Sequence, residues 1–167
     1  MPRMAPARTL HVAAFAAVSV AVVVLDQLTK ASARALLADG TVRALVPGVI
    51  DLRLVQNTGA AFSIGQGGSA VFALLALAIA GVALYYVAQT PDAGWPITVS
   101  LACVAGGGIG NMLDRILLGH VTDFLATSFV SFPVFNVADI FVTCGVVVSF
   151  VAYLRSSRAD GGEAGEA

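Results

Sequence analysis

Residues 69–87 read SAVFALLALAIAGVALYYV, a stretch of nineteen residues without a charged side chain. A helix needs about 20 mostly apolar residues to cross the hydrocarbon core of a bilayer. The stretch therefore predicts a membrane-spanning helix. Three further stretches predict such helices, at residues 10–37, 97–118 and 136–154. The first of them is apolar only to about residue 25, and a polar segment then continues the helix to residue 37.

The composition of the whole chain supports a membrane protein. Hydrophobic residues make up 58% of the 167 residues and charged residues 11%, whereas soluble domains are about 45–50% apolar and about 25% charged. A small soluble fold exposes much of its surface to water, so it has no place for this many apolar side chains. We expect an all-α membrane protein with a four-transmembrane-helix bundle at residues 1–155, followed by a disordered cytoplasmic tail at residues 156–167.

Basic residues near the ends of the spans predict the orientation. Arg3 and Arg8 precede the first span, and Arg155 and Arg158 follow the fourth. Because cytoplasmic ends carry the excess of Arg and Lys, we expect both termini in the cytoplasm. The first span also resembles a signal peptide, but no small-residue cleavage site follows it, so we expect it to be retained.

Two segments then face outward, at residues 38–68 and 119–135. Within the first, residues 49–55 partly alternate between apolar and polar side chains. This alternation predicts a short strand near the membrane surface.

Several classes of function find no support in the sequence. The net charge is −1, and nucleic-acid binding would need a clustered basic face. His11 and His120 are isolated, and no HExxH motif occurs, so we expect neither a metal nor another cofactor. Cys103 and Cys144 lie in apolar stretches, and we interpret them as small packing residues.

Polar residues interrupt the apolar pattern in short clusters, although an ionisable side chain in lipid costs roughly 2.5–3.5 kcal/mol. In the first cluster, DQLTK at 26–30, Asp26 and Lys30 share a helix face and can pair. They form either a simple interfacial ion pair or part of a site. The second cluster, NTGAAF at 57–62, contains Asn57 and Gly59. It is either an ordinary turn or a place where a peptide approaches the backbone.

The third cluster is GGIGNMLDR at residues 107–115. Glycines at this density allow helices to pack closely in lipid. Asn111, Asp114 and Arg115 stand at positions i, i+3 and i+4, so we expect them to point to one side. For Asp114 we favour a structural role, because the adjacent Arg115 would keep it ionised and paired.

The last two clusters each contain one acid, Asp123 in VTDF at 121–124 and Asp139 in FNVAD at 135–139. We expect Asp123 in a short outer loop, and Asp139 at the start of the fourth span on the same face as Asn136. Fifteen residues separate the two acids, so both are predicted at the outer end of the bundle.

Two carboxyl groups that share a low-dielectric site tend to hold one proton between them. The ionised partner can then take a proton from water, and the protonated partner can protonate a leaving amine. This is aspartic-protease chemistry. The sequence contains no GxSxG motif and no Cys/His constellation, which disfavours a nucleophilic enzyme. Two unrelated structural acids remain the alternative.

Taken together and in this order, the five clusters resemble the lipoprotein signal peptidase (signal peptidase II) family. GGIGNMLDR and FNVAD are the most specific of them. The resemblance implies an aspartic endopeptidase of the bacterial cytoplasmic membrane, which removes signal peptides from diacylglyceryl-modified prolipoproteins on the amino side of the lipobox cysteine. It implies that Asp123 and Asp139 are the catalytic dyad. The substrate-binding or supporting residues it implies are Asn57, Gly59, Asn111, Asp114, Arg115, Asn136, Asp26 and Lys30.

The resemblance also implies an outer β-cradle and loop at residues 49–68, an active site at the periplasmic face, and inhibition by the cyclic peptide globomycin. The partners would be the prolipoprotein substrate and membrane lipid, and we expect a monomer. The chain departs little from the family pattern. The loop between Phe124 and Phe135 is short and uncharged, and the connection at 88–96 lacks Lys and Arg.

Two other functions compete with a peptidase. In a transporter or proton-coupled channel, the acids would line a pathway across the membrane. The expected gathering of polar residues at one membrane end disfavours this reading. In a structural membrane subunit, the polar residues would only hold helices together, and Asp→Asn changes would be tolerated.

Overall fold

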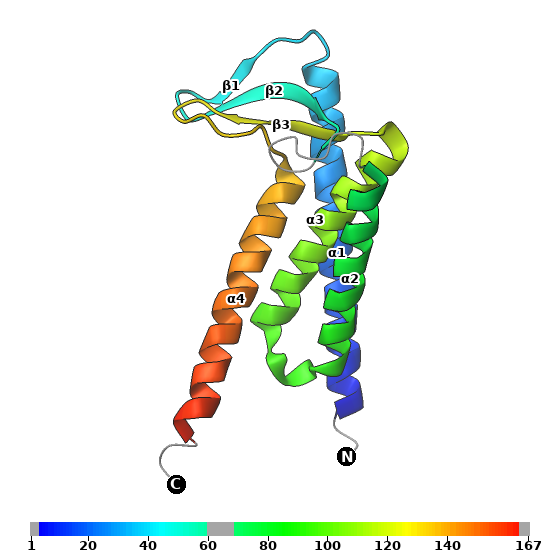
Figure 1. The fold of residues 1–167 in the computed structure, drawn as a ribbon, viewed down its shortest axis with the longest axis vertical. Helices are drawn as coiled ribbons and strands as arrows, with labels where there is room; N and C mark the ends of the chain where they lie inside the picture. The colour runs from blue at the N-terminus through cyan, green and yellow to red at the C-terminus, as the bar shows by residue number, and fades with distance from the viewer. Residues whose placement is uncertain (1–3, 60–68, 164–167) are drawn as a thin grey trace.

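A computed structural model describes residues 4–59 and 69–163 of the chain, and within them it contains four long helices and a small sheet (Figure 1). This confirms the predicted fold class. A short 3-10 helix, η2, joins α2 to α3. The elements in chain order are α1 (Met4–Leu36), β1 (Arg43–Val46), β2 (Ile50–Asn57), α2 (Ser69–Gln89), η2 (Pro91–Ala93), α3 (Trp95–Leu118), β3 (Val121–Thr127) and α4 (Val137–Glu163).

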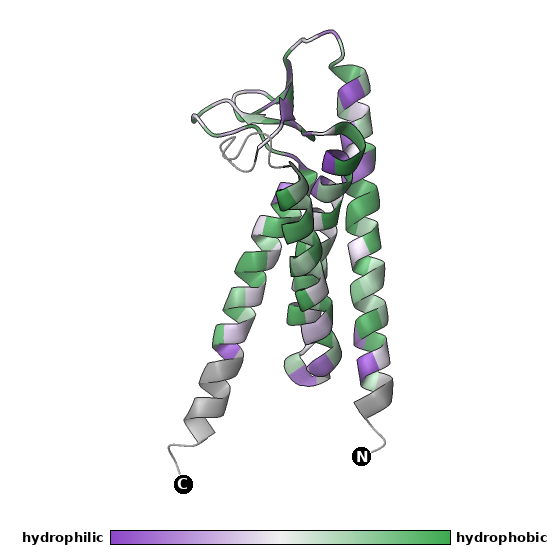
Figure 2. Cartoon of the chain, turned by 45° about the vertical axis from the view of Figure 1, so that its right-hand side comes forward, coloured by the Kyte–Doolittle hydropathy of each residue, from purple (hydrophilic) through white to green (hydrophobic). Residues whose placement is uncertain are grey.

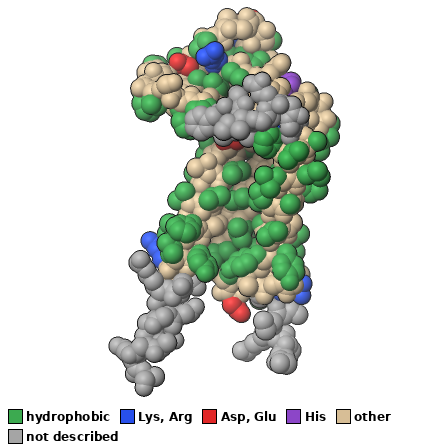
Figure 3. All heavy atoms as spheres, viewed as in Figure 1, with side chains coloured by type: hydrophobic (Ala, Val, Ile, Leu, Met, Phe, Trp, Pro, Cys, Tyr) green, Lys and Arg blue, Asp and Glu red, His purple; other side chains and the backbone are tan. Residues whose placement is uncertain are grey.

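Each long helix contains a stretch that is long and apolar enough to cross a bilayer, namely Ala7–Leu36, Ala70–Gln89, Trp95–Leu118 and Val137–Arg155. Apolar residues run along the helices, and polar residues gather toward their ends and at the sheet (Figure 2). Large apolar side chains such as Val71, Leu74 and Val82 are exposed. Figure 3 shows hydrophobic side chains spread along the helices on the face in view. In water such a surface would be unfavourable, so the solvent around these helices is lipid.

The central helix is α3, which packs against α1, α2 and α4. Its glycines allow this close packing. A Cβ atom at Gly106 would lie 2.7 Å from the backbone oxygen of Ser19 in α1, and one at Gly107 would lie 2.6 Å from that of Ala138 in α4. The backbones therefore meet without intervening side chains, as small residues permit in lipid-embedded helices.

The sheet lies at the end of the bundle opposite the two termini (Figure 1). It is antiparallel with the order β1-β2-β3, and Val55 of β2 pairs with Asp123 of β3. Asp123 is therefore in a strand, and the predicted outer loop at this position is wrong. Residues Val121–Leu125 are all buried, so this segment shows no alternation between apolar and polar residues that would have indicated a strand.

The chain after β3 turns back on itself. Phe135 forms an isolated bridge with Leu125, and its backbone nitrogen donates to the oxygen of Leu125 at 3.0 Å. This bridge fixes the chain immediately before Asn136, beside the strand that carries Asp123. The start of α4 is thereby held against the sheet.

The end of α4 differs from the expected tail. The helix continues to Glu163, so residues 156–163 are not the disordered segment that we predicted, while residues 164–167 lie outside the described part of the chain. No proline follows the span, and adding residues to an existing helix costs little compared with starting one. The domain boundary at residue 155 stays a prediction.

Candidate active site

Asp123 and Asp139 line one cavity of about 530 Å³ where the sheet meets α3 and α4. β3 supplies Asp123 and the first turn of α4 supplies Asp139. The wall also contains Asn57 from β2 and Asn111 from α3. The remaining lining residues are Arg115, Val121, Phe132, Pro133, Val134, Phe135, Ile140, Val142, Thr143 and Cys144.

Asp123 is held by two asparagine amides. Asn57 Nδ2 donates to its Oδ2 at 2.9 Å, and Asn136 Nδ2 donates to its Oδ1 at 2.7 Å. Only 3% of Asp123 is exposed. Burial raises the pKa of Asp123 from 3.8 to about 6; the hydrogen bond from Asn57 opposes this, and the charge of Asp139 adds to it. Asp123 therefore changes its protonation state close to neutral pH.

Asp139 is held by a reciprocal cap at the start of α4. The backbone nitrogen of Asn136 donates to Asp139 Oδ2 at 3.0 Å, and the backbone nitrogen of Asp139 donates to Asn136 Oδ1 at 3.1 Å. Asn is a favoured N-cap residue, and an acidic side chain three positions later completes such a cap. The carboxylate of Asp139 accepts a second hydrogen bond at Oδ1, from Asn111 Nδ2 at 2.9 Å.

Asn136 thus contacts both acids, and it is fully buried. Its amide donates to Asp123 while its backbone caps Asp139. The structure brings the two carboxyl groups to one site through a shared asparagine. Both acids lie at the same end of the bundle, as expected, although Asp123 is in β3 and not in a loop. A catalytic role for the two acids remains a prediction.

Arg115 is near the acids but contacts other groups. Its Nη2 donates to the oxygen of Gly59 at 2.8 Å and its Nη1 to the oxygen of Asn111 at 3.3 Å, and the guanidinium lies 5.3 Å from the centre of the Phe72 ring. The backbone nitrogen of Gly59 donates to Asn57 Oδ1 at 3.0 Å. Arg115 therefore ties α3 to the end of β2. Residues 60–62, the end of the NTGAAF cluster at 57–62, lie outside the described residues.

The partners of Asp114 correct our interpretation of this residue. We expected it to pair with Arg115 and to share its side of the helix. Instead, Asp114 Oδ2 accepts the backbone nitrogen of Thr122 at 2.8 Å and lies 3.6 Å from Lys30 Nζ. The spacing of positions 111, 114 and 115 does not show that Asp114 and Arg115 point to different neighbours, because adjacent residues lie about 100° apart around a helix.

Asp26 and Lys30 pair as their spacing predicts, at 2.8 Å, and both side chains are fully buried. They are therefore not an interfacial ion pair facing water. Lys30 Nζ also donates to Asn111 Oδ1 at 2.7 Å. Asp26 Oδ1 accepts the backbone nitrogen of Ala138 at 3.0 Å. The pair therefore contacts Asn111, which donates to Asp139, and the backbone of the residue before Asp139.

Three further polar residues belong to this network but not to our predicted site: Gln27, Arg34 and Thr122. Gln27 Nε2 donates to the oxygen of Gly110 at 3.0 Å and to Asp114 Oδ1 at 3.2 Å. Arg34 Nη1 donates to Thr122 Oγ1 at 2.9 Å. A signal for Arg34 was present, because it continues the four-residue spacing of Asp26 and Lys30 on one helix face.

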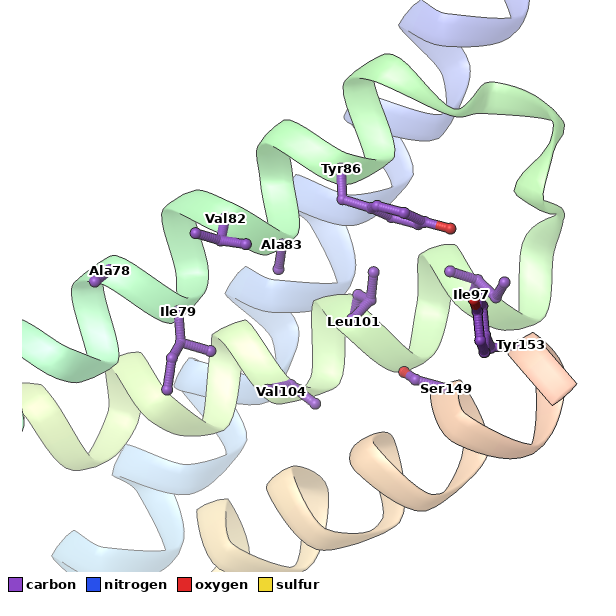
Figure 4. Close-up of a pocket in the computed structure, with 10 residues that line it drawn as sticks. All are labelled: Ala78, Ile79, Val82, Ala83, Tyr86, Ile97, Leu101, Val104, Ser149 and Tyr153. Carbon is purple, nitrogen blue, oxygen red and sulfur yellow. The ribbon is translucent and has the colours of Figure 1, made fainter.

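A second cavity, of about 460 Å³, lies between α2, α3 and α4 (Figure 4). Its walls are apolar apart from Ser149, Tyr86 and Tyr153, and no acid lines it. It therefore offers no acid–base pair. Within the described ranges, no group of three His, Cys, Asp or Glu side chains is placed to hold a metal ion, and Cys103 and Cys144 are free thiols.

Comparison with known proteins identifies the family. A family model described as signal peptidase (SPase) II matches residues 18–155. Two lipoprotein signal peptidases of Streptococcus pyogenes are similar. The serotype M1 protein is 39% identical over 129 residues, 77% of this chain and 85% of the relative. The serotype M5 (strain Manfredo) protein is 40% identical over 126 residues, 75% and 83% of the two chains.

Two solved structures of bacterial membrane enzymes share the fold. The structure at 2.3 Å resolution has a TM-score of 0.76 and 29% identity, with 86% of this chain and 88% of the other covered. The structure at 1.9 Å resolution has a TM-score of 0.71 and 30% identity, with 84% and 92% covered. With a buried and a half-buried acid on one cavity of a four-helix membrane protein, and with this similarity along most of its length, the chain belongs to the signal peptidase II family.

Proposed function

We propose that this protein is an aspartic endopeptidase that removes signal peptides from diacylglyceryl-modified prolipoproteins, cutting on the amino side of the lipidated lipobox cysteine. Its family and its relatives, which are lipoprotein signal peptidases, support this activity. The observation that carries the proposal is the shared cavity of Asp123 and Asp139 at one end of four membrane-spanning helices. The two acids act as the catalytic dyad.

The dyad begins the cycle with one proton between its two carboxyl groups. The ionised carboxylate takes a proton from water, and the water oxygen attacks the scissile carbonyl carbon while the protonated carboxyl donates to the carbonyl oxygen. The carbon–nitrogen bond of the resulting tetrahedral intermediate then breaks. The leaving amine receives the proton that one carboxyl took from water, and the other carboxylate takes back a proton from a hydroxyl of the intermediate as the new carboxyl group forms. The products are a new carboxyl end and a new amino end, and the dyad returns to its single proton. The raised pKa of Asp123, about 6, favours such sharing near neutral pH.

The surroundings of the dyad suit a membrane-inserted substrate. The scissile segment must be unwound, and lipid penalises unpaired backbone groups. Asn57, Asn111 and Arg115 line the cavity and offer amide and guanidinium groups to that backbone. Apolar lining residues such as Phe132 and Ile140 offer contacts for the signal helix and the lipid. Binding energy from these remote parts positions the bond for attack.

The same arrangement supports a location and an orientation. Both termini lie at the end of the bundle away from the sheet (Figure 1), and Arg8 and Arg155 lie near that end. By the positive-inside rule, this end is cytoplasmic and the dyad faces the periplasm of a bacterial inner membrane. The dyad and the asparagines that hold it come from one chain, which supports a monomeric enzyme.

Cleavage of a diacylglyceryl-modified lipobox peptide, with and without globomycin, tests the proposal. Asp123→Asn and Asp139→Asn should each lower kcat by about a thousandfold or more, as loss of a general acid or base does, while the protein still inserts. Asp39→Asn, an acid that is 52% exposed beside the sheet, should keep full activity. Full activity in either dyad variant would end the assignment. Proton or solute flux in liposomes would indicate a transporter instead.

A further inference from the structure

We propose that Lys30, together with Asp26, is a positioning residue for Asp139, because it fixes the direction in which the Asn111 amide points. The inference rests on the proposed function in one respect, since it takes Asp139 to be catalytic. Lys30 does not line the cavity, so it acts through Asn111 and not on the substrate.

The two ends of the Asn111 amide have partners of opposite kinds. Its oxygen accepts from Lys30 Nζ at 2.7 Å and from Asn136 Nδ2 at 3.1 Å. Its nitrogen donates to Asp139 Oδ1 at 2.9 Å. An ammonium group has three donors and no acceptor, whereas a carboxylate only accepts. The reversed amide would set its NH2 group against the ammonium and its oxygen against the carboxylate, so only one orientation satisfies these partners.

A second connection runs through Asp26. Its Oδ2 holds Lys30 at 2.8 Å, and its Oδ1 accepts the backbone nitrogen of Ala138 at 3.0 Å. Ala138 directly precedes Asp139. The ion pair is therefore connected to Asp139 by two indirect routes, one through the Asn111 side chain and one through the backbone at the start of α4.

Because the ion pair is buried, its effect on the orientation of Asn111 can be tested separately from its effect on stability. Both side chains of the pair are 0% exposed. Taking two charges out of water costs several kcal/mol, so a buried ion pair is often replaceable by neutral residues with little loss of stability. Removing one partner alone leaves an uncompensated buried charge and destabilises strongly. Neutral replacement of both partners thus tests orientation without that penalty.

The test compares two double variants of the full-length protein in the lipobox-peptide cleavage assay. Asp26→Asn/Lys30→Gln keeps an N–H donor at position 30, whereas Asp26→Asn/Lys30→Met has similar size and no donor. The other charged groups near position 30 are Asp114 and its partner Arg34, and both are unchanged in the two double variants. We expect the two variants to have similar thermal stability and similar KM. The kcat of the Met variant should be about tenfold to a hundredfold below that of the Gln variant. This factor corresponds to loss of one hydrogen bond to a charged group, here the bond from Asn111 to Asp139.

Equal kcat values for the Met and Gln variants would overturn the inference, whether both are active or both impaired. Asp139→Asn in the same assay separates this outcome from failure of the proposed function. If that variant is inactive while the Met and Gln variants match, only the role of Lys30 is lost. If it is fully active, the dyad assignment fails first.

A measurement on the unmodified protein covers the case in which the double variants do not fold. Lys30 is the single lysine of the chain, so labelling lysine with ¹⁵N at Nζ is specific to this site. Solid-state NMR with ¹³Cγ-labelled asparagine should show Nζ in direct contact with an asparagine side-chain carbonyl. Absence of that contact would also overturn the inference.

Discussion

A methyl group added at Gly107 should both destabilise the protein and slow cleavage. Gly107 lies where α3 crosses the start of α4. A Cβ atom at this position would be 2.6 Å from the backbone oxygen of Ala138 and 2.8 Å from Val142 Cγ2. The first of these neighbours is backbone, so the helices must separate before alanine fits. The neighbouring Gly108 is the matched control, because its Cβ would lie 3.6 Å from Ala76 Cβ, an ordinary contact.

The expected magnitude follows from two opposing effects. Alanine gains about 1 kcal/mol over glycine in a helix interior. Overpacking of a well-packed contact costs about 1–3 kcal/mol, and the contact with a backbone oxygen puts Gly107→Ala at the upper end. We therefore expect Gly107→Ala to lose about 2 kcal/mol, or about 4–8 °C in Tm for a chain of this size. Gly108→Ala should be neutral or more stable by up to about 1 kcal/mol.

The same displacement should reach the dyad. Ala138 precedes Asp139, and opening the 2.6 Å contact to an ordinary distance moves the start of α4 by a sizeable fraction of an ångström. A misplacement of about 1 Å can cost about a hundredfold in rate, so we expect at least about a tenfold loss of kcat in Gly107→Ala.

Thermal unfolding in detergent and kcat on the lipobox peptide should be measured for both variants under the same conditions. If Gly107→Ala is as stable and as active as Gly108→Ala, the close contact between α3 and α4 does not hold the dyad.

Three further predictions concern the cavity. The raised pKa of Asp123, about 6 against an ordinary 3.8, means that the folded protein holds a proton that the unfolded chain has lost between these pH values. The free energy of unfolding should therefore fall by about 3 kcal/mol as pH rises from about 4 to about 6. Denaturant titrations of Asp123→Asn should not show this fall. Asn57→Ala removes a hydrogen bond that lowers the pKa of Asp123, so the limb of the kcat/KM profile near pH 6 should move to higher pH, and an unmoved limb would contradict this. Cys144→Trp places a ring in the cavity and should raise KM about tenfold or more, whereas Val146→Trp, at an exposed position of the same helix, should leave KM unchanged.

Much of the site could be predicted because its residues follow local rules. The Asp26–Lys30 pair follows from helical spacing. The two acids could be expected at the same end of the bundle because only fifteen residues separate them and Asp139 is at the start of a span. Arg34 was missed although it continues the same spacing.

The rest depended on which segments meet. The partners of Asp114 and Arg115 were mistaken because adjacent residues on a helix face different neighbours, here Thr122 of β3 and Gly59 after β2. The sequence predicts a loop where β3 carries Asp123, because burial of successive side chains removes the alternation that marks a strand.

The sequence by itself determined that this is a membrane protein with four spans, because the length and apolarity of a segment decide whether lipid accepts it. It also determined which polar side chains were available near the outer end. Only the tertiary structure decided how they pair: Lys30 reaches Asn111 from 81 positions away, and Asn136 contacts both acids because the bridge at Phe135 folds the chain back onto β3. Such contacts depend on packing between helices and sheet, which no local pattern encodes.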